Sequence, residues 1–127
     1  SALPVPTGHT FNRQQITLNL SQYIPIYVYG KIAARVRAAN PKILTPPRPD
    51  CPPSTWYDPV ITPCLLRPYP FTLAFENSMA NDYASEKVYN PLLVGSVPVY
   101  AGAPNIDNLV PPQSIVKLAD FPTLEDL

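Results

Sequence analysis

Two short polar segments carry the side chains best suited to chemistry. Glu76-Asn77-Ser78 directly follows an apolar run, and Tyr83-Ala-Ser-Glu86-Lys87 stands near the start of a predicted helix. A helix start with a nearby lysine suits a phosphate, because free backbone N–H groups and the ammonium group both attract the anion. A carboxylate such as that of Glu86 accepts hydrogen bonds from hydroxyl groups. Together the two segments suit a ligand that contains both a phosphate and a sugar.

The same residues also fit plainer interpretations. A Glu-Lys pair on a helix often forms only a solvated face, and Asn77 and Ser78 at the end of a strand are often turn formers. Taken alone, the two segments leave both interpretations open.

Other kinds of chemistry have little support in the sequence. The single histidine is His9, and nothing places a nucleophile beside it. His9, Cys51 and Cys64 do not have the spacing of metal ligands. Nine basic residues balance nine acidic ones, and zero net charge disfavours binding to nucleic acid. No apolar stretch of the sequence approaches the ~20 residues of a membrane-spanning helix.

The predicted strands and helix around these residues alternate in the order that is typical of a parallel α/β sheet. Apolar runs at 71–75, 97–101 and 114–118 predict strands, and residues 82–94 predict a helix that ends at Gly95. In such sheets ligands bind beyond the carboxyl ends of the strands. The other predicted elements are a helix over 12–23 capped by Asn12, a strand over 24–29, a helix over 31–39 and the beginning of a helix over 120–127.

Proline is unevenly distributed. Ten of the 19 prolines lie in residues 41–70, so we expect this stretch to be an extended insert or linker. Pro46-Pro47 and Pro52-Pro53 are compatible with the polyproline II helix. A non-catalytic module that binds glycans or proline-recognising partners through residues 41–70 is therefore one alternative for the function. A plain linker crossing the domain surface is the other interpretation of the stretch.

Several blocks of the chain recur in a known family in the same order and spacing. They are FTLAFENS at 71–78, YASEK at 83–87 and LLVGSVPV at 92–99, preceded by the segment 12–31 with its Asn12-Arg13 and Gly30-Lys31 pairs. These blocks resemble the α1,3/4-fucosyltransferase family. The resemblance covers residues 12–31 and 69–127, and residues 41–70 match the family poorly.

The resemblance implies a fold and an activity. The fold is α/β, a Rossmann-like parallel sheet that forms the C-terminal half of a two-domain GT-B type glycosyltransferase. Residues 1–127 would form one partial domain that binds GDP-fucose. The enzyme would transfer L-fucose with inversion to a GlcNAc hydroxyl of a glycan, in an α1,3-type linkage. A GT-B transferase that uses another nucleotide sugar is the nearest alternative.

The resemblance also assigns site residues. Those for donor binding are Arg13, Glu76, Asn77, Tyr83, Glu86 and Lys87. Arg13 and Lys87 would neutralise the diphosphate, and Glu86 would contact fucose or ribose hydroxyls. Tyr83 would line the nucleotide pocket, while Glu76 and Asn77 would shape the site. No Asp-x-Asp motif occurs, so we expect no metal or other cofactor, and cations of the protein would offset charge on the leaving GDP.

Two departures from the family pattern lie near these residues. Ser85 replaces a threonine and keeps a hydroxyl group. Pro91 falls inside the expected helix, where an interior proline costs about 3 kcal/mol and kinks the helix. We therefore expect the helix to be disturbed after Lys87, with the site itself on the first turn.

The acceptor half of the family is not recognised in these residues. It would bind the glycan acceptor and hold the general base, so we expect no catalytic residue within 1–127 and no transfer by this chain alone. The resemblance further implies a type II Golgi membrane protein, lumenal, with its anchor outside these residues. A lumenal location permits a disulfide between Cys51 and Cys64.

Overall fold

The computed structural model describes residues 12–29, 33–43 and 61–127. The chain forms two compact units. One consists of Ser1–Pro49 with Phe121–Leu127, and the other of Asp50–Asp120. This division does not test the single domain predicted over residues 1–127, which stays a prediction.

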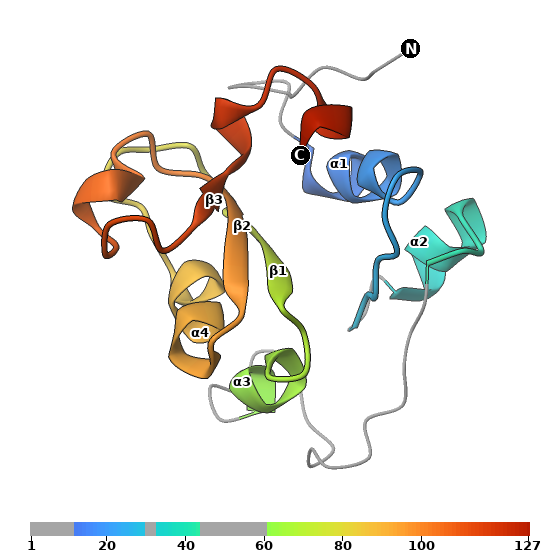
Figure 1. Ribbon diagram of the computed structural model, residues 1–127. Coiled ribbons are helices and arrows are strands. Elements are labelled where there is room, and N and C mark those ends of the chain that lie inside the picture. Colours follow the sequence, from blue (N-terminus) through green and yellow to red (C-terminus); the bar gives the residue numbers. More distant parts are fainter. Residues whose placement is uncertain (1–11, 30–32, 44–60) are drawn as a thin grey trace. The chain divides into compact units, whose positions relative to one another are not determined.

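The second unit contains the predicted parallel sheet (Figure 1). Its strands are β1 (Phe71–Phe75), β2 (Val97–Ala101) and β3 (Val116–Lys117), in the order β1-β2-β3 and all parallel. Along β1 and β2 the register pairs Phe71 with Val97 and Phe75 with Ala101. The α/β prediction is therefore confirmed, although β3 is shorter than the strand predicted over 114–118.

Helix α4 (Glu86–Val94) connects β1 to β2 and contacts both strands. A parallel pair of strands needs such a crossover, because its strands run in the same direction. The core between the sheet and its neighbours contains Ala74, Val88, Tyr100 and Ile106. This β1-α4-β2 unit places the start of α4 beyond the carboxyl end of β1.

The two ends of α4 differ in how well the sequence predicted them. The helix begins at Glu86, not at residue 82, because Asp82 has a φ of 64° and directs the chain into a turn. It ends as predicted at Gly95, whose φ of 79° is left-handed. The disturbance expected at Pro91 does not end the helix, which continues to Val94. Pro91 and Val88 are buried, so packing outweighs the poor helical propensity of proline.

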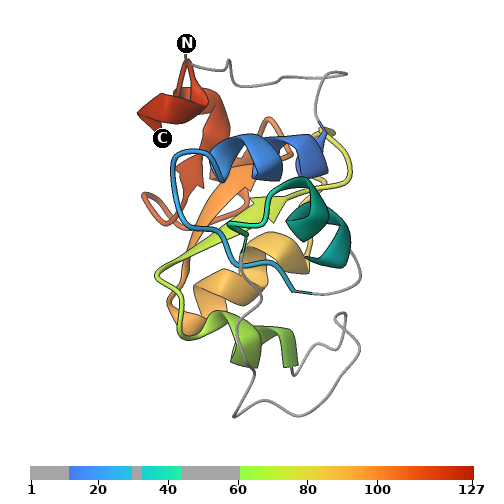
Figure 2. The same cartoon turned by 90° about the vertical axis from the view of Figure 1, so that its right-hand side faces the viewer.

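Part of the proline-rich stretch is helical, which corrects the expectation of an extended connection over all of 41–70. Helix α3 (Ile61–Leu66) lies within it and contacts α4 (Figure 2). Pro63 falls in the first turn of α3, where backbone N–H groups have no partner inside the helix and proline is tolerated. Residues 44–60 lie outside the described residues. Cys51 is among them, so the predicted disulfide with Cys64 of α3 stays a prediction.

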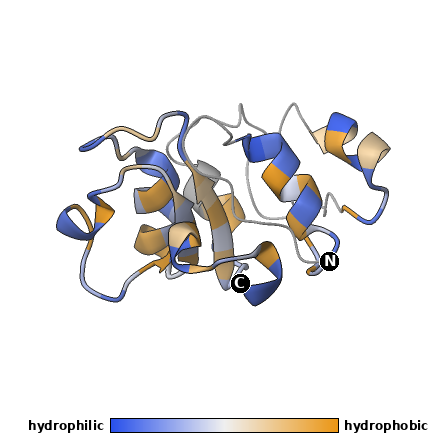
Figure 3. Ribbon diagram, turned by 90° about the horizontal axis from the view of Figure 1, so that it is seen from above, coloured by the Kyte–Doolittle hydropathy of each residue, from blue (hydrophilic) through white to orange (hydrophobic). Residues whose placement is uncertain are grey.

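The first unit contains α1 (Arg13–Leu20), α2 (Ala33–Ala39) and a 3₁₀ turn, η4 (Leu124–Asp126). Asn12 caps α1 as predicted, with its Oδ1 accepting the Gln15 N–H at 3.0 Å. The ribbon of α1 alternates between hydrophilic and hydrophobic segments (Figure 3), and Ile16 and Leu20 are its buried residues. Helix α1 contacts both α2 and η4.

Two other predicted elements are wrong. No strand forms over 24–29, where Tyr27 makes only an isolated bridge, and Pro25 cannot donate to a ladder. Instead of a helix from residue 120, the chain makes the 3₁₀ turns η3 (Leu118–Asp120) and η4. Pro122 separates these turns, and the residue before a proline avoids the helical region. None of the helices in the described parts of the chain is long and apolar enough to cross a membrane.

Candidate functional site

Five of the six predicted site residues lie between the end of β1 and the first turn of α4. They are Glu76, Asn77, Tyr83, Glu86 and Lys87. Their place beyond the carboxyl end of a parallel strand is where such sheets bind ligands. The sixth, Arg13, is the exposed first residue of α1 and belongs to the other compact unit.

Glu76 is a buried carboxylate with both oxygens engaged. Its exposed fraction is 1%. Its Oε2 accepts the Ser85 N–H at 2.6 Å and its Oε1 accepts the Ser85 hydroxyl at 2.5 Å. The Glu76 N–H donates to the Ala101 carbonyl at 2.8 Å, which extends the pairing of β1 with β2. These contacts suit the predicted shaping role, because they tie the turn to the sheet.

Ser85 links Glu76 to the start of α4. It is the N-cap residue, and its Oγ accepts the Lys87 N–H at 3.3 Å while donating to Glu76. A side-chain acceptor at this position satisfies one of the free N–H groups of a helix start. The sequence signal was the hydroxyl that Ser85 keeps, but its buried carboxylate partner was not predicted.

Tyr100 of β2 is a second buried residue that holds the turn. Its ring is 2% exposed. The Tyr100 hydroxyl accepts the Ala103 N–H at 2.9 Å and donates to the Tyr83 carbonyl at 3.4 Å. Burial raises the pKa of Tyr100 above its ordinary value of 10.0, the Ala103 N–H opposes this rise, and the charge of Glu76 adds to it. A protonated Tyr100 is therefore favoured in the folded protein.

Gly102 allows these buried groups to lie close together. A Cβ atom at this position would lie 2.5 Å from the Glu76 Cγ and 2.5 Å from the Tyr100 Oη. Both distances are far shorter than the 3.5–4.0 Å of an ordinary contact. The strand end after β2 therefore requires glycine for packing.

A third contact joins the turn to the loop after β2. The Asp82 N–H donates to the Asn105 Oδ1 at 2.8 Å, and the Asn105 Nδ2 donates to the Asp82 Oδ1 at 2.7 Å. No local sequence signal indicates this pair, since the two residues lie 23 positions apart.

The side chains predicted to meet a ligand are more exposed than the groups that hold the turn. Tyr83 is 40% exposed. The side chains of Glu86 and Lys87 are 66% and 28% exposed, with the Lys87 Nζ 3.4 Å from the Glu86 Oε1. An exposed ion pair of this kind contributes little to stability. The Glu86 side chain thus faces solvent, whereas that of Lys87 is half-buried.

A second lysine of the same unit is already engaged. The Nζ of Lys117 in β3 lies 2.7 Å from the Asp107 Oδ2. This hydrogen bond raises the pKa of Lys117. Among the described residues, no three His, Cys, Asp or Glu side chains are grouped to hold a metal ion. That no metal is required stays a prediction.

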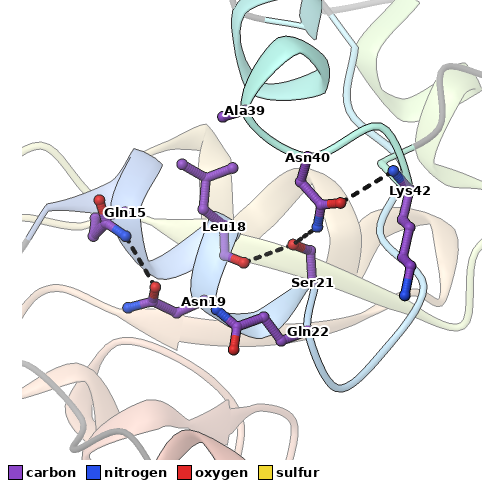
Figure 4. Close-up of a pocket in the computed structure, with 8 residues that line it drawn as sticks. All are labelled: Gln15, Leu18, Asn19, Ser21, Gln22, Ala39, Asn40 and Lys42. Carbon is purple, nitrogen blue, oxygen red and sulfur yellow. Dashed lines mark hydrogen bonds between the residues drawn. The ribbon is translucent and has the colours of Figure 1, made fainter.

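A polar depression in the first unit contains none of the predicted site residues (Figure 4). Its volume is about 470 Å³, and it lies where α1 and α2 end. Asn40 donates to the Ser21 Oγ at 2.6 Å, and Ser21 donates to the Leu18 carbonyl at 2.6 Å. The hydrogen bonds thus join the two helix ends. The lining residues are Gln15, Leu18, Asn19, Ser21, Gln22, Ala39, Asn40 and Lys42.

Sequence comparisons show which known proteins this chain resembles. Residues 6–127 match the sequence model of glycosyltransferase family 10 (fucosyltransferase), C-terminal part. An α-(1,4)-fucosyltransferase of Arabidopsis thaliana is 31% identical over 121 residues, which are 91% of this chain and 29% of the relative. The chain therefore belongs to the C-terminal part of glycosyltransferase family 10, as the sequence resemblance predicted.

Shorter matches join the chain to a second group of relatives. GDP-fucose protein O-fucosyltransferase 3 of Xenopus tropicalis is 53% identical over 47 residues, 37% of this chain and 10% of the relative. The human protein of that name is 41% identical over 58 residues, 45% of this chain and 12% of the relative. The chain thus spans less than a third of the length of these relatives.

Proposed function

We propose that this chain supplies the donor-binding half of a fucosyltransferase that uses GDP-fucose. The observation that carries this proposal is the turn from Glu76 to Lys87. Its backbone is tied to the sheet, and beyond the carboxyl end of β1 its Tyr83 and Glu86 side chains are exposed while that of Lys87 is half-buried. Lys87 binds the diphosphate, Glu86 accepts hydrogen bonds from fucose or ribose hydroxyls, and Tyr83 lines the nucleotide pocket.

The reaction that we propose is transfer of L-fucose with inversion to a GlcNAc hydroxyl of a glycan, in an α1,3-type linkage. Lys87 offsets the negative charge that develops on the leaving GDP, which is the role of preorganised cations in such transfers. The acceptor and the general base belong to another half of the enzyme. The chain alone therefore binds GDP-fucose without transferring fucose. We further propose that the enzyme acts in the Golgi lumen, held by an anchor outside these residues.

A protein acceptor is the second candidate. The relatives named GDP-fucose protein O-fucosyltransferase 3 match this chain at 41–53% identity over 47–64 residues. That identity is higher than the 31% shared with the Arabidopsis α-(1,4)-fucosyltransferase, although over a shorter part of the chain. The donor side is the same in both candidates, and only the group that accepts fucose differs.

One assay separates the candidates. The full-length protein is incubated with labelled GDP-fucose and either an N-acetyllactosamine acceptor or a folded protein domain that presents serine and threonine hydroxyls. We expect label on the GlcNAc residue, with the inverted configuration at fucose. Label on the protein domain alone would replace the glycan acceptor with a protein acceptor. Label on neither acceptor, together with no binding of GDP-fucose, would contradict the proposed function.

A further inference from the structure

The backbone of the donor turn is held at three closely spaced points, while the side chains proposed to meet the donor are left exposed. At residue 85 the anchor is the Glu76 carboxylate. At residue 83 it is the Tyr100 hydroxyl. At residue 82 it is the Asn105 side-chain amide. A site whose supporting groups are fixed before the ligand arrives loses less entropy on binding.

The contact at residue 82 differs from the other two. Asn105 and Asp82 exchange two hydrogen bonds, of 2.8 Å and 2.7 Å, and both lie near the surface. Asp82 adopts a φ of 64°, a left-handed conformation that is uncommon for residues other than glycine. The Asp82 N–H donates to the Asn105 Oδ1. The Asn105 side chain thereby fixes the turn immediately before Tyr83.

The loop that carries Asn105 is itself well fixed. It leaves β2 through Gly102, where only glycine fits beside Glu76 and Tyr100. The Ala103 N–H is held by the Tyr100 hydroxyl at 2.9 Å, and Ile106 is part of the core. The loop is therefore anchored on both sides of Asn105, so that this residue can hold Asp82 in place.

We propose that Asn105 and Asp82 form a clasp that positions the donor turn, and that Asn105 is a positioning residue for donor binding. The inference rests on the proposed function, because it takes Tyr83, Glu86 and Lys87 as donor contacts. Neither member of the clasp touches the donor. Their effect passes through the backbone at residues 82 and 83, so losing the clasp weakens binding of the donor more than it slows the chemical step.

The two residues permit a charge-swap test. Asn105→Asp places a second carboxylate against Asp82 and removes the donated hydrogen bond, so like charges repel across the clasp. Asp82→Asn combined with Asn105→Asp restores one amide and one carboxylate, and asparagine tolerates the left-handed conformation at residue 82. Asn108→Asp is the matched control, because it adds the same charge three residues further along on an exposed side chain. Asn105→Ala removes the hydrogen bonds without adding charge.

The readout is the KM for GDP-fucose and the kcat of transfer in the full-length protein, with unfolding midpoints for each variant. We expect Asn105→Asp to raise KM about fivefold or more, which is in the range of interaction energies between residues in direct contact. The kcat should be nearly unchanged. Asn105→Ala should have a smaller effect of the same kind. The double variant should return KM to within about twofold of the wild type, and Asn108→Asp should leave it unchanged.

Two outcomes would overturn the clasp while leaving the donor site intact. One is a normal KM in both Asn105 variants. The other is a loss of stability in which kcat falls by as much as KM rises and the double variant restores neither. That result would mean that the pair has only a structural role. A wild-type protein that shows no binding of GDP-fucose would instead overturn the proposed function, and the clasp with it.

Discussion

The Glu76 carboxylate, buried at the end of β1, receives both hydrogen-bond donors of Ser85, the residue that caps α4. A strand end and a helix start are thereby joined through one acidic side chain. This contact fixes the position from which the Glu86-Lys87 pair faces solvent. It also makes Glu76 important for stability in addition to its place in the candidate site.

Replacing Glu76 with glutamine should destabilise the protein. A glutamine keeps one acceptor but places an NH₂ group against the other Ser85 donor. Hydrogen bonds to charged groups are worth about 1.5–3 kcal/mol, and we expect a loss of about that size in the free energy of unfolding. Urea unfolding measures it. The control is Glu125→Gln at an exposed glutamate, which should change stability by less than about 0.5 kcal/mol. Equal effects of the two variants would show that the Ser85 contacts contribute nothing.

Gly102→Ala should displace the side chains that hold the turn from Glu76 to Lys87. The new Cβ would lie 2.5 Å from both the Glu76 Cγ and the Tyr100 Oη, so these buried side chains must shift. Overpacking of this kind costs about 1–3 kcal/mol, and the displaced turn should also raise KM for GDP-fucose.

The control for this variant is Gly95→Ala. Nothing lies within 4 Å of a Cβ at residue 95, but its φ of 79° disfavours alanine, so it should lose about 1–2 kcal/mol through backbone strain alone. We expect the KM of that control to stay normal. A normal KM in Gly102→Ala as well would argue that the turn does not depend on the packing at residue 102.

Tyr100→Phe should change how stability depends on pH. Because the pKa of Tyr100 is raised in the folded protein, the folded state holds the phenolic proton more tightly than the unfolded state. This stabilisation is complete below the ordinary pKa of 10.0. It is lost as the pH rises from that value through the raised pKa.

The measurement is the urea midpoint of unfolding from about pH 8 to about pH 11. The wild type should lose stability at the alkaline end, and Tyr100→Phe should lose less. The phenylalanine variant should also be less stable by about 1–3 kcal/mol near neutral pH, because the Ala103 N–H loses its partner. Tyr89→Phe, at a partly exposed tyrosine of α4, should keep the alkaline loss. Identical alkaline slopes for wild type and Tyr100→Phe would contradict the role of burial at residue 100.

Lys87 and Glu86 give the direct test of the candidate contacts. Lys87→Ala should weaken binding of GDP-fucose tenfold or more, since a hydrogen bond to a charged group is worth about 1.5–3 kcal/mol. Glu86→Ala should lower transfer with the fold kept. Lys117→Ala is the matched control, because this lysine is paired with Asp107 at 2.7 Å in the same unit. Unchanged kinetics in both site variants would mean that Glu86 and Lys87 form only a solvated helix face.

The sequence predicted well those features that depend on local chemistry. The Asn12 cap, the Gly95 stop and the apolar runs of β1 and β2 each rest on a few neighbouring residues, and all three appear in the structure. The failures come from longer-range effects. Residues 24–29 have strand-forming side chains but no ladder, and Pro91 is tolerated because it is buried.

The candidate site shows the same division. The position of Glu86 and Lys87 on the first turn of α4 followed from the order of strand and helix. The partners of Tyr83 and Asp82 did not, because Tyr100 near the end of β2 and Asn105 beyond it reach the turn only once the parallel pairing has formed. A strand register brings such residues together without any local sequence signal.

Calorimetric titration measures whether the turn from Glu76 to Lys87 binds GDP-fucose. GDP-fucose, a UDP-sugar and a CMP-sugar are titrated separately into the full-length protein and into its Lys87→Ala and Lys117→Ala variants. We predict saturable binding of GDP-fucose alone, weakened tenfold or more by Lys87→Ala and unaffected by Lys117→Ala. Binding of all three nucleotide sugars with equal affinity, or equal binding of GDP-fucose by both variants, would contradict a GDP-fucose site at this turn.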